Sequence, residues 1–420
     1  MKIAIAVVGA LLLGLPALAA EEPKSDDDAR IKALAEELRR LKLELALPET
    51  EYKSYAGMGP AASKVYFVPR GLSVGGYGEL TFAKGLQEGA RSTTDILRVV
   101  AYTGYRFSDR IVFNAEIEFE HGSTEKLGAV NVEFAYLDFK LTDFLSARVG
   151  NVLVPIGFIN EMHEPAFFSG VARPDVERLL IPSTWNENGL GVYGAYGPLR
   201  YKAYVMTGLR AVKNEGDKNE GFVDESWIRE GRQAGSKARA DGLAGVVNLS
   251  FEQDIFRVAG TLYYGRSGQG AQVSGSEVRG DVLLGELHGS VAWRGLSARA
   301  LFARGTLTDT DLISLENGSI VGSRVQGGYG EVAFDVLTFF APGSSHSLTP
   351  FVRYEAYNLH HGVAEGMSKD ASLNRRNFVA GATYKPVPTV ALKADFQSLS
   401  NMAPASSART QLNLGAGFIF

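Results

Sequence analysis

Cysteine is absent from this chain of 420 residues. Its absence excludes disulfide bonds, thiolate metal sites, cysteine nucleophiles and the lipid-modified N-terminal cysteine of a bacterial lipoprotein. A positive charge excess is also lacking, because 43 Lys and Arg stand against 47 Asp and Glu, with a net charge of -4. This balance gives no electrostatic support for nucleic acid binding. Long apolar runs are missing too: after residue 20, no stretch approaches the roughly 20 apolar residues of a membrane-spanning helix.

The first residues have the pattern of an export signal. Lys2 supplies the positive start, residues 3–15 are apolar, Pro16 interrupts the run, and Ala17-Leu18-Ala19 is a small-x-small cleavage pattern. The sequence therefore predicts a signal peptide over residues 1–19. An uncleaved membrane anchor is the alternative, but the apolar run is short for a spanning helix. An exported chain without membrane helices is either soluble in the periplasm or a barrel in the outer membrane.

Residues 20–47 are predicted to form an N-terminal α-helix. Its apolar residues recur at spacings of three and four, as in the seam of a coiled coil, and Pro48 ends the pattern. The seam consists of Ile31, Leu34, Leu38, Leu41 and Leu45. We expect this coiled coil to associate with copies of itself; the alternative is a single amphipathic helix lying on the barrel or the membrane. Residues 48–70, which contain Gly57, Gly59, Pro60 and Pro69, are interpreted as a linker.

From residue 71 the hydrophobic period changes to two. In residues 111–120, one face is apolar from Ile111 to Phe119, whereas the other carries Asn114, Glu116, Glu118 and Glu120. A row of carboxylates cannot lie unpaired in a dry core, but it can line a water-filled lumen. Apolar-out and polar-in alternation over about ten residues is typical of a strand in a lipid-embedded barrel.

Such segments repeat to the end of the chain, and short connections alternate with long ones, as in bacterial outer-membrane barrels. The predicted fold is all-β: a transmembrane antiparallel β-barrel of about 16 strands over residues 71–420, with the short N-terminal coiled-coil helix before it. Fourteen or eighteen strands are the alternatives. The strands are expected near 71–84, 94–107, 110–121, 129–141, 144–154, 188–196, 199–209, 242–253, 256–266, 280–293, 296–306, 324–338, 346–359, 374–385, 389–400 and 408–420.

The last strand has a pattern of its own. Leu412, Leu414, Ala416, Phe418 and Phe420 share one face, and the chain stops on this aromatic residue. The strand resembles the C-terminal signal by which outer-membrane proteins are recognised by the barrel-insertion machinery. The expected location is therefore the bacterial outer membrane, with its lipid and lipopolysaccharide as surroundings.

Residues 155–187 are too long and too rich in proline for a strand. A barrel of this size is too wide for its wall side chains to fill. We predict that this loop folds inward and forms a constriction; a flap packed on the rim is the alternative.

Several motifs resemble the phosphate-selective porin O and P family. They are Arg106-Phe107-Ser108-Asp109-Arg110, the stretch from Glu116 to His121, Glu133-Phe134-Ala135-Tyr136-Leu137-Asp138-Phe139, Val154-Pro155-Ile156-Gly157, Asn160-Glu161, His163-Glu164-Pro165, Arg173-Pro174, Glu177 and Trp185. The resemblance covers about 70–210 and implies a homotrimeric diffusion porin with an inward-folded third loop. Phosphate selectivity does not follow, because this loop is acidic where the family's phosphate-binding members cluster arginines.

Fourteen residues are expected to face the pore, and the first ten form the predicted pore-lining and constriction set. They are Arg98, Glu116, Glu118, Arg148, Glu161, His163, Glu164, Arg173, Glu177 and Arg178, with Lys202, Arg299, Arg353 and Lys393 along the wall. They predict passive diffusion of small hydrophilic solutes and ions, with carboxylates favouring cations. Alternatively, these charges pair with one another and do not determine the ion selectivity of the pore. A channel specific for anions such as phosphate, or for sugars, is the competing function.

An enzyme is not predicted. The six histidines lie in no catalytic motif, and His163, between Glu161 and Glu164, does not match the His-Glu-x-x-His pattern of zinc proteases. No cofactor and no metal site is expected.

Overall fold

The computed structural model describes residues 29–37, 53–122, 128–214, 220–404 and 408–420. The chain divides into two compact units, Met1–Tyr52 and Lys53–Phe420. In the first unit, residues 29–37 form an α-helix. The predicted signal peptide and the rest of the predicted helix over 20–47 lie outside the described residues. No helix in the described ranges has both the length and the apolar character needed to cross a membrane.

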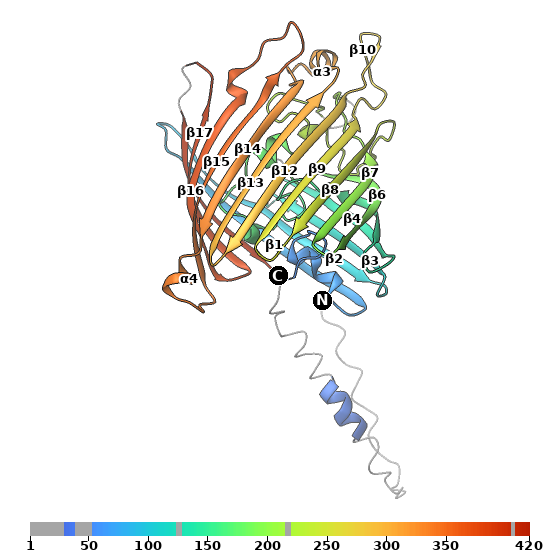
Figure 1. The fold of residues 1–420 in the computed structure, drawn as a ribbon, viewed down its shortest axis with the longest axis vertical. Coiled ribbons are helices and arrows are strands. Elements are labelled where there is room, and N and C mark those ends of the chain that lie inside the picture. The colour runs from blue at the N-terminus through green and yellow to red at the C-terminus, as the bar shows by residue number, and fades with distance from the viewer. Residues whose placement is uncertain (1–28, 38–52, 123–127, 215–219, 405–407) are drawn as a thin grey trace, which may run out of the picture. The chain divides into compact units, whose positions relative to one another are not determined.

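The second unit is a closed antiparallel barrel of 16 strands, in which each strand pairs with its neighbours along the chain and β1 pairs with β18 (Figure 1). The predicted fold class is therefore confirmed. The barrel strands are β1 Gly71–Gly85, β2 Ser92–Arg106, β3 Ile111–Glu120, β4 Ala129–Lys140, β5 Ser146–Leu153, β6 Asn186–Tyr196, β7 Leu199–Thr207, β8 Leu243–Glu252, β9 Phe256–Arg266, β12 Asp281–Trp293, β13 Leu296–Leu307, β14 Arg324–Phe334, β15 Ser347–Gly362, β16 Asn374–Val387, β17 Val390–Asn401 and β18 Arg409–Ile419.

The remaining elements lie in the connections and before β1. A small hairpin pairs β10 with β11, and the other pieces are short helices. Their bounds are β10 Gln272–Val273, β11 Ser276–Glu277, α2 Pro60–Ser63, α3 Thr310–Asn317, α4 Leu337–Phe340, η1 Lys64–Tyr66, η2 Pro165–Phe167, η3 Val176–Leu180, η4 Arg229–Gly231 and η5 Ala371–Leu373.

The two faces of the wall differ as the alternation predicts. On β8, Leu243, Val247 and Leu249 are about half exposed on the outer face, whereas Asn248 and Ser250 are buried on the inner face. The same pattern recurs around the barrel, whose exposed large residues are mostly Leu, Val and Phe. Such an apolar outer wall requires lipid around it, because water would not tolerate so large an apolar surface.

The last strand closes the barrel. Phe420 and Gly76 exchange two backbone hydrogen bonds, of 3.0 and 2.9 Å. The Phe420 ring covers the backbone of Gly76, where a Cβ atom would lie 2.7 Å from the ring. Glycine at position 76 of β1 thus leaves room for the ring of the terminal aromatic residue.

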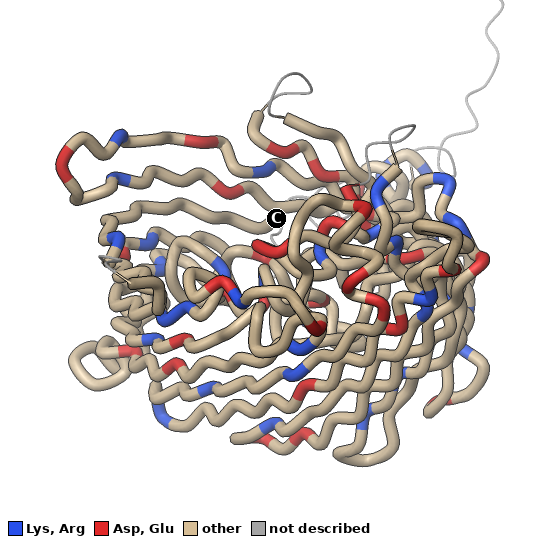
Figure 2. Tube along the Cα trace, turned by 90° about the horizontal axis from the view of Figure 1, so that it is seen from above, with Lys and Arg blue, Asp and Glu red and all other residues tan. Residues whose placement is uncertain are grey.

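Three segments enter the barrel interior, and Figure 2 shows backbone with charges of both signs inside the ring of strands. Loop 3 (residues 154–185) connects β5 to β6, and loop 4 (residues 208–242) connects β7 to β8. The third segment, residues 53–68, precedes β1. The sequence indicates a linker there, but Met58, Ala61, Ala62 and Val65 are buried at 2% exposure or less. Gly57 adopts a positive φ in a turn, Pro60 begins helix α2, and the apolar side chains pack against the inner wall.

Candidate functional site

Loop 3 lies inside the barrel and spans the lumen. Near its start, the Thr261 hydroxyl of β9 donates a hydrogen bond of 2.9 Å to the carbonyl of Pro155. Further along, the backbone N–H of Val171 donates to Asp395 of β17 at 2.6 Å, and that of Val176 donates to Glu355 of β15 at 3.1 Å. The wall thus satisfies the polar groups of a loop that crosses to the opposite side.

The two ends of loop 3 are joined by one side chain. The Asn160 amide donates to the carbonyls of Val154 and Trp185, at 2.7 and 2.9 Å, and its oxygen accepts from the Trp185 N–H at 2.7 Å. Ile156, Ile159 and Trp185 are buried around this closure. The loop therefore has an apolar core of its own, which fixes its path inside the barrel.

The predicted acidic residues each contact a protein partner, and all but the half-buried Glu161 are buried. Glu116 contacts Nε2 of His163 at 3.0 Å, and Glu118 binds Arg98 at 3.0 Å. Glu161 binds Lys202 at 2.5 Å. Glu164 accepts a hydrogen bond of 3.0 Å from the N–H of Ala62, and burial raises the pKa of this loop carboxyl to about 7. These carboxylates satisfy protein groups, so the pairing alternative describes them better than a cation-attracting wall does.

Glu177 links two parts of loop 3 to each other and to the barrel wall. Its carboxylate accepts hydrogen bonds from the N–H groups of Phe158 and Ile159, at 2.7 and 2.9 Å, and from the Tyr329 hydroxyl of β14 at 2.5 Å. It is 1% exposed, and burial raises its pKa. The predicted pore-facing residue therefore holds the loop in shape.

Arg148 belongs to a buried cluster on the inner wall. Its guanidinium makes two bonds to Asp138, of 2.7 and 2.9 Å, and its Cζ lies 3.9 Å from the centre of the Tyr136 ring. The hydroxyls of Tyr66 and Tyr193 also donate to Asp138. Arg148 and Asp138 are 2% and 3% exposed, so this fork is a packed pair with no access to solute.

Replacing Asp138 by Asn should destabilise the barrel by about 3–5 kcal/mol, because Arg148 would remain buried without its countercharge. Denaturant unfolding of the barrel in detergent, followed by intrinsic fluorescence, measures this loss. The matched control is Asp143→Asn, which breaks the ion pair of Lys140 with an almost fully exposed partner and should change stability little. Equal stability of the two variants would contradict the assignment.

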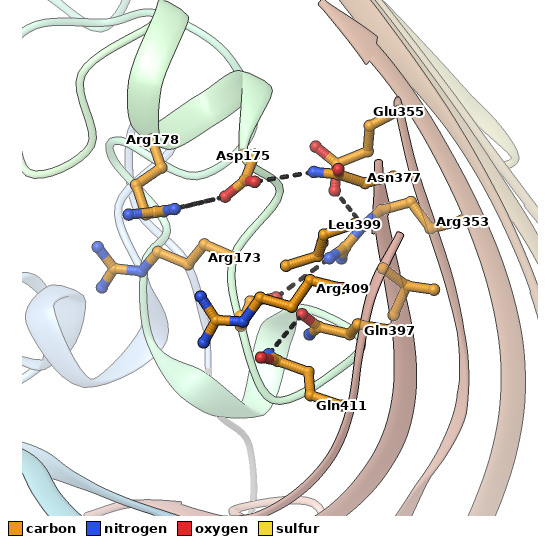
Figure 3. A pocket seen from close by; sticks show the side chains of 12 residues that line it. Arg173, Asp175, Arg178, Arg353, Glu355, Asn377, Gln397, Leu399, Arg409 and Gln411 are labelled. Atoms are coloured by element: carbon orange, nitrogen blue, oxygen red, sulfur yellow. Dashed lines mark hydrogen bonds and ion pairs between the residues drawn. The ribbon is translucent and has the colours of Figure 1, made fainter. Parts of the chain in front are cut away.

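An open pocket remains on the other side of the lumen, against β15–β18 (Figure 3). Its volume is about 250 Å³. It is lined by Ala172, Arg173, Asp175, Arg178, Arg353, Glu355, Asn377, Val379, Gln397, Leu399, Arg409 and Gln411. We call it the β15–β18 pocket. Four arginines and two carboxylates make its lining basic.

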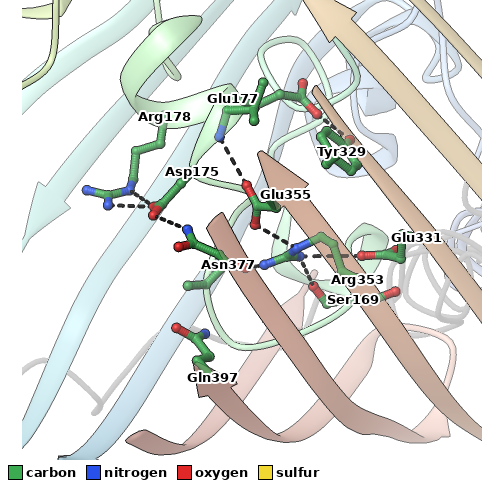
Figure 4. Close-up of polar contacts among 12 residues, drawn as sticks. Ser169, Asp175, Glu177, Arg178, Tyr329, Glu331, Arg353, Glu355, Asn377 and Gln397 are labelled. Carbon is green, nitrogen blue, oxygen red and sulfur yellow. Dashed lines mark hydrogen bonds and ion pairs between the residues drawn. The ribbon is translucent and has the colours of Figure 1, made fainter. Parts of the chain in front are cut away.

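The arginines of this pocket differ in their ion pairing and in their exposure. Arg353 is 2% exposed and binds Glu355 at 2.9 Å and Glu331 at 3.4 Å (Figure 4). Arg178 binds Asp175 at 2.6 Å but its side chain remains 43% exposed. Arg173 donates to the carbonyl of His163 at 3.3 Å, and no carboxylate of the described residues lies within 4.0 Å of it. Among the pocket arginines of loop 3, Arg178 is therefore ion-paired but accessible, whereas Arg173 is buried without a carboxylate partner in the described residues.

Loop 4 adds two arginines to this side. Arg229 lies near Arg232, Arg178 and Arg173, and burial together with the Arg232 charge lowers its pKa to about 10. Arg232 donates to the carbonyl of Ser183 in loop 3 at 2.6 Å. Nearby Trp227 is fully buried, with its ring against Gly305 on the inner face of β13. Loop 4 is thus in part an internal segment, whereas its charge pattern suggests a solvated surface.

The predicted site residues thus form two groups. Most pair with one another or with loop backbone, as described, and Arg173 and Arg178 alone of the ten line the β15–β18 pocket. Sequence reasoning missed Arg409, Gln397 and Asn377. Arg409, Gln411 and Asn413 are spaced two residues apart on β18 and therefore share its inner face. Following this alternation back from Gln411 to Arg409 would have identified Arg409 as an inward-facing residue.

Within the described residues, no group of three His, Asp or Glu side chains is arranged to hold a metal ion. His163 directs Nε2 at Glu116, and its Nδ1 lies 3.0 Å from the carbonyl oxygen of Asn160.

Comparison with known proteins places the chain among barrels of the same size. No family model matches. A protein of Aquifex aeolicus (strain VF5), named only as an uncharacterized protein, is 37% identical over 372 residues, which are 85% of this chain and 82% of that protein.

Solved structures share the fold. Salmonella typhi OmpF in complex with daunomycin has a TM-score of 0.53 at 12% identity, over 84% of this chain and 98% of that one. The outer membrane channel DcaP of Acinetobacter baumannii has a TM-score of 0.53 at 11% identity, over 83% and 97%. A loop L8 deletion mutant of Vibrio cholerae OmpT has 0.51 at 13% identity, over 83% and 100%. At these identities the likeness shows the fold, and the fold with its apolar outer wall assigns the chain to the bacterial outer membrane.

Proposed function

The chain belongs to the same family as the Aquifex aeolicus protein, and from this premise and its outer-membrane barrel fold we propose that it is a porin. It would allow passive diffusion of small hydrophilic solutes and ions, with a preference for anions. The observation that carries this proposal is the β15–β18 pocket, an open space inside the barrel with a basic lining.

The two halves of the lumen differ in which charged side chains remain accessible. Along β1–β7, the inward side chains Tyr77, Glu116 and Tyr136 are at most 2% exposed, and Arg353 and Val379 on the opposite wall are equally buried. Along β15–β18, Arg178 and Arg409 remain accessible beside a cavity large enough for several water molecules. A hydrated solute would therefore pass along β15–β18, where arginine charge attracts anions.

The sequence predicts a cation preference from Glu116, Glu118, Glu161 and Glu164. In the fold these carboxylates bind His163, Arg98, Lys202 and the backbone of Ala62. A carboxylate with a positive partner beside it adds little net field at the opposite wall, because the two charges largely cancel at that distance. We therefore expect a preference for anions, the opposite of the cation preference that the sequence predicts.

Single-channel recording in planar bilayers, with a KCl gradient across the membrane, tests this function. We expect a water-filled conductance and a reversal potential of the sign given by chloride permeating faster than potassium. A cation-selective reversal potential would contradict the anion preference, and no conductance at all would contradict the porin assignment. Heat-denatured protein added at the same concentration is the control.

A second candidate function is a channel specific for an oxyanion such as phosphate. Arg229 of loop 4 lies within electrostatic reach of Arg232 and of Arg173 and Arg178 from loop 3, and the arginine fork matches phosphate oxygens. Phosphate that blocks the chloride current at low concentration, when sulfate at the same concentration does not, would favour this function.

We also propose that the chain assembles as a homotrimer, since the predicted seam of residues 20–47 fits self-association. Chemical cross-linking of the purified protein in detergent would show the number of chains.

A further inference from the structure

We propose that residues 53–68, here called the plug segment, close the β1–β7 half of the lumen and thereby keep its carboxylates away from the permeation path. Plug position would then set both conductance and ion preference. The inference deepens the proposed channel function and rests on it.

The middle of the plug segment is tightly packed. Residues 58–63, six in succession, are all buried, although they belong to no strand of the barrel. The inner wall beside them is equally closed: a Cβ atom on Gly104 of β2 would lie 2.7 Å from the Cβ of Val65. A segment packed this tightly cannot line a path for hydrated solutes, so it blocks its half of the lumen.

Wall and loop side chains hold the plug segment through its backbone. Asn114 of β3 donates to the carbonyl of Ala62 at 2.8 Å, while Glu164 of loop 3 accepts from the N–H of the same residue at 3.0 Å. Lys202 of β7 donates to the carbonyl of Ala56 at 2.6 Å. The segment is therefore fixed at the centre by both the wall and loop 3.

Acidic side chains adjoin the plug segment. Glu161 and Glu164 of loop 3 and Asp138 of β4 contact the plug segment or its anchors, and Glu116 and Glu118 follow on β3. If the segment moved out, water would enter beside these carboxylates, and Glu164 would lose its backbone donor. The new path would hold these carboxylates with their partners Arg98, Arg148 and Lys202. Glu164, left without its donor, would add negative charge there, whereas the β15–β18 pocket is basic.

Displacement need not break the barrel. The plug segment contributes no strand, and its helices α2 and η1 contain only 4 and 3 residues. Its chain connection to the wall is at β1 alone. Because strand pairing carries the barrel, the segment can leave while the ladder from β1 to β18 stays intact.

The test uses the full-length chain with Ala62→Glu. Ala62 is 2% exposed and adjoins Glu164, so a second carboxylate there adds both bulk and like charge. We expect a higher single-channel conductance than wild type and a shift of the reversal potential toward cations. Ser54→Glu, on an exposed residue of the same segment, is the matched control and should leave both quantities unchanged.

A second measurement reports the position of the segment directly. Because the chain has no cysteine, Val65→Cys with Gly104→Cys creates a single possible disulfide. A shift of about 1 Å would bring the two Cβ atoms to the usual spacing of about 3.8 Å. We expect the bond to form under oxidation in the otherwise wild-type chain, and to form far less when Ala62→Glu is added.

The outcomes separate the two levels of inference. Wild-type protein that conducts, with Ala62→Glu barrels of normal heat-modifiable gel mobility that conduct identically, would overturn the plug. Failure of the Val65–Gly104 cross-link in the folded wild-type background would overturn it as well. If neither wild type nor Ala62→Glu conducts, the porin function itself fails.

Discussion

Replacing Arg178 and Arg409 together by glutamate should convert the channel from anion preference to cation preference. Both side chains are accessible in the β15–β18 pocket, on opposite sides of it, one from loop 3 and one from β18 (Figure 3). At about 8 Å, each unit of charge changes the energy of a passing ion by roughly 0.5 kcal/mol in bulk water and about 2 kcal/mol at an effective dielectric constant of 20. Two reversals should therefore change the permeability ratio by at least about tenfold.

The reversal potential in a KCl gradient measures this effect. The matched control reverses the same number of charges at Arg304 and Arg376, which are exposed on the outer face of β13 and β16. The control should keep the wild-type sign. An unchanged reversal potential in Arg178→Glu/Arg409→Glu would show that the permeation path lies elsewhere.

Replacing Arg353 by Met should both destabilise the barrel and loosen loop 3. The Arg353 guanidinium binds Glu355 and Glu331 and also donates to the carbonyls of Ser169 and Ala172, at 3.4 and 3.3 Å (Figure 4). Met fills a similar volume but leaves Glu355 buried without its partner, which costs about 3–5 kcal/mol. We expect unfolding at lower denaturant concentration and a noisier open-channel current, because loop 3 loses an anchor on β15.

The conservative variant Arg353→Lys keeps the charge but cannot make four bonds in a plane, so its loss should be intermediate. The double variant Arg353→Met/Glu355→Gln also removes the negative charge that Arg353→Met leaves buried without a partner. It should therefore recover part of the stability. If Arg353→Met unfolds at the wild-type denaturant concentration, this ion cluster has no role in holding loop 3.

Sequence alone predicts the barrel because its signals are local. The alternation on residues 111–120 places Ile111 outside and Glu116 inside without any knowledge of distant residues, and the fold confirms both. The alternating short and long connections predict the strand number, and β18 appears where the terminal pattern predicts it. Period two assigns a face to each side chain, so the inward direction of Arg148, Lys202, Arg299, Arg353 and Lys393 was predictable as well.

What fills the lumen was decided only by tertiary structure. Glu116 meets His163 from 47 residues away, and Glu355 meets the N–H of Val176 across 179 residues. Periodicity shows that a residue faces inward but cannot show what lies opposite, because the contacts run across the barrel between segments without a repeating pattern. Loop 3 and the plug segment cover the carboxylates of the β1–β7 wall, whereas Arg178 and Arg409 remain accessible in the β15–β18 pocket. The sign of the charge offered to a solute therefore follows from which charges are neutralised by packing, a property of the folded lumen that the inner-face residues alone do not determine.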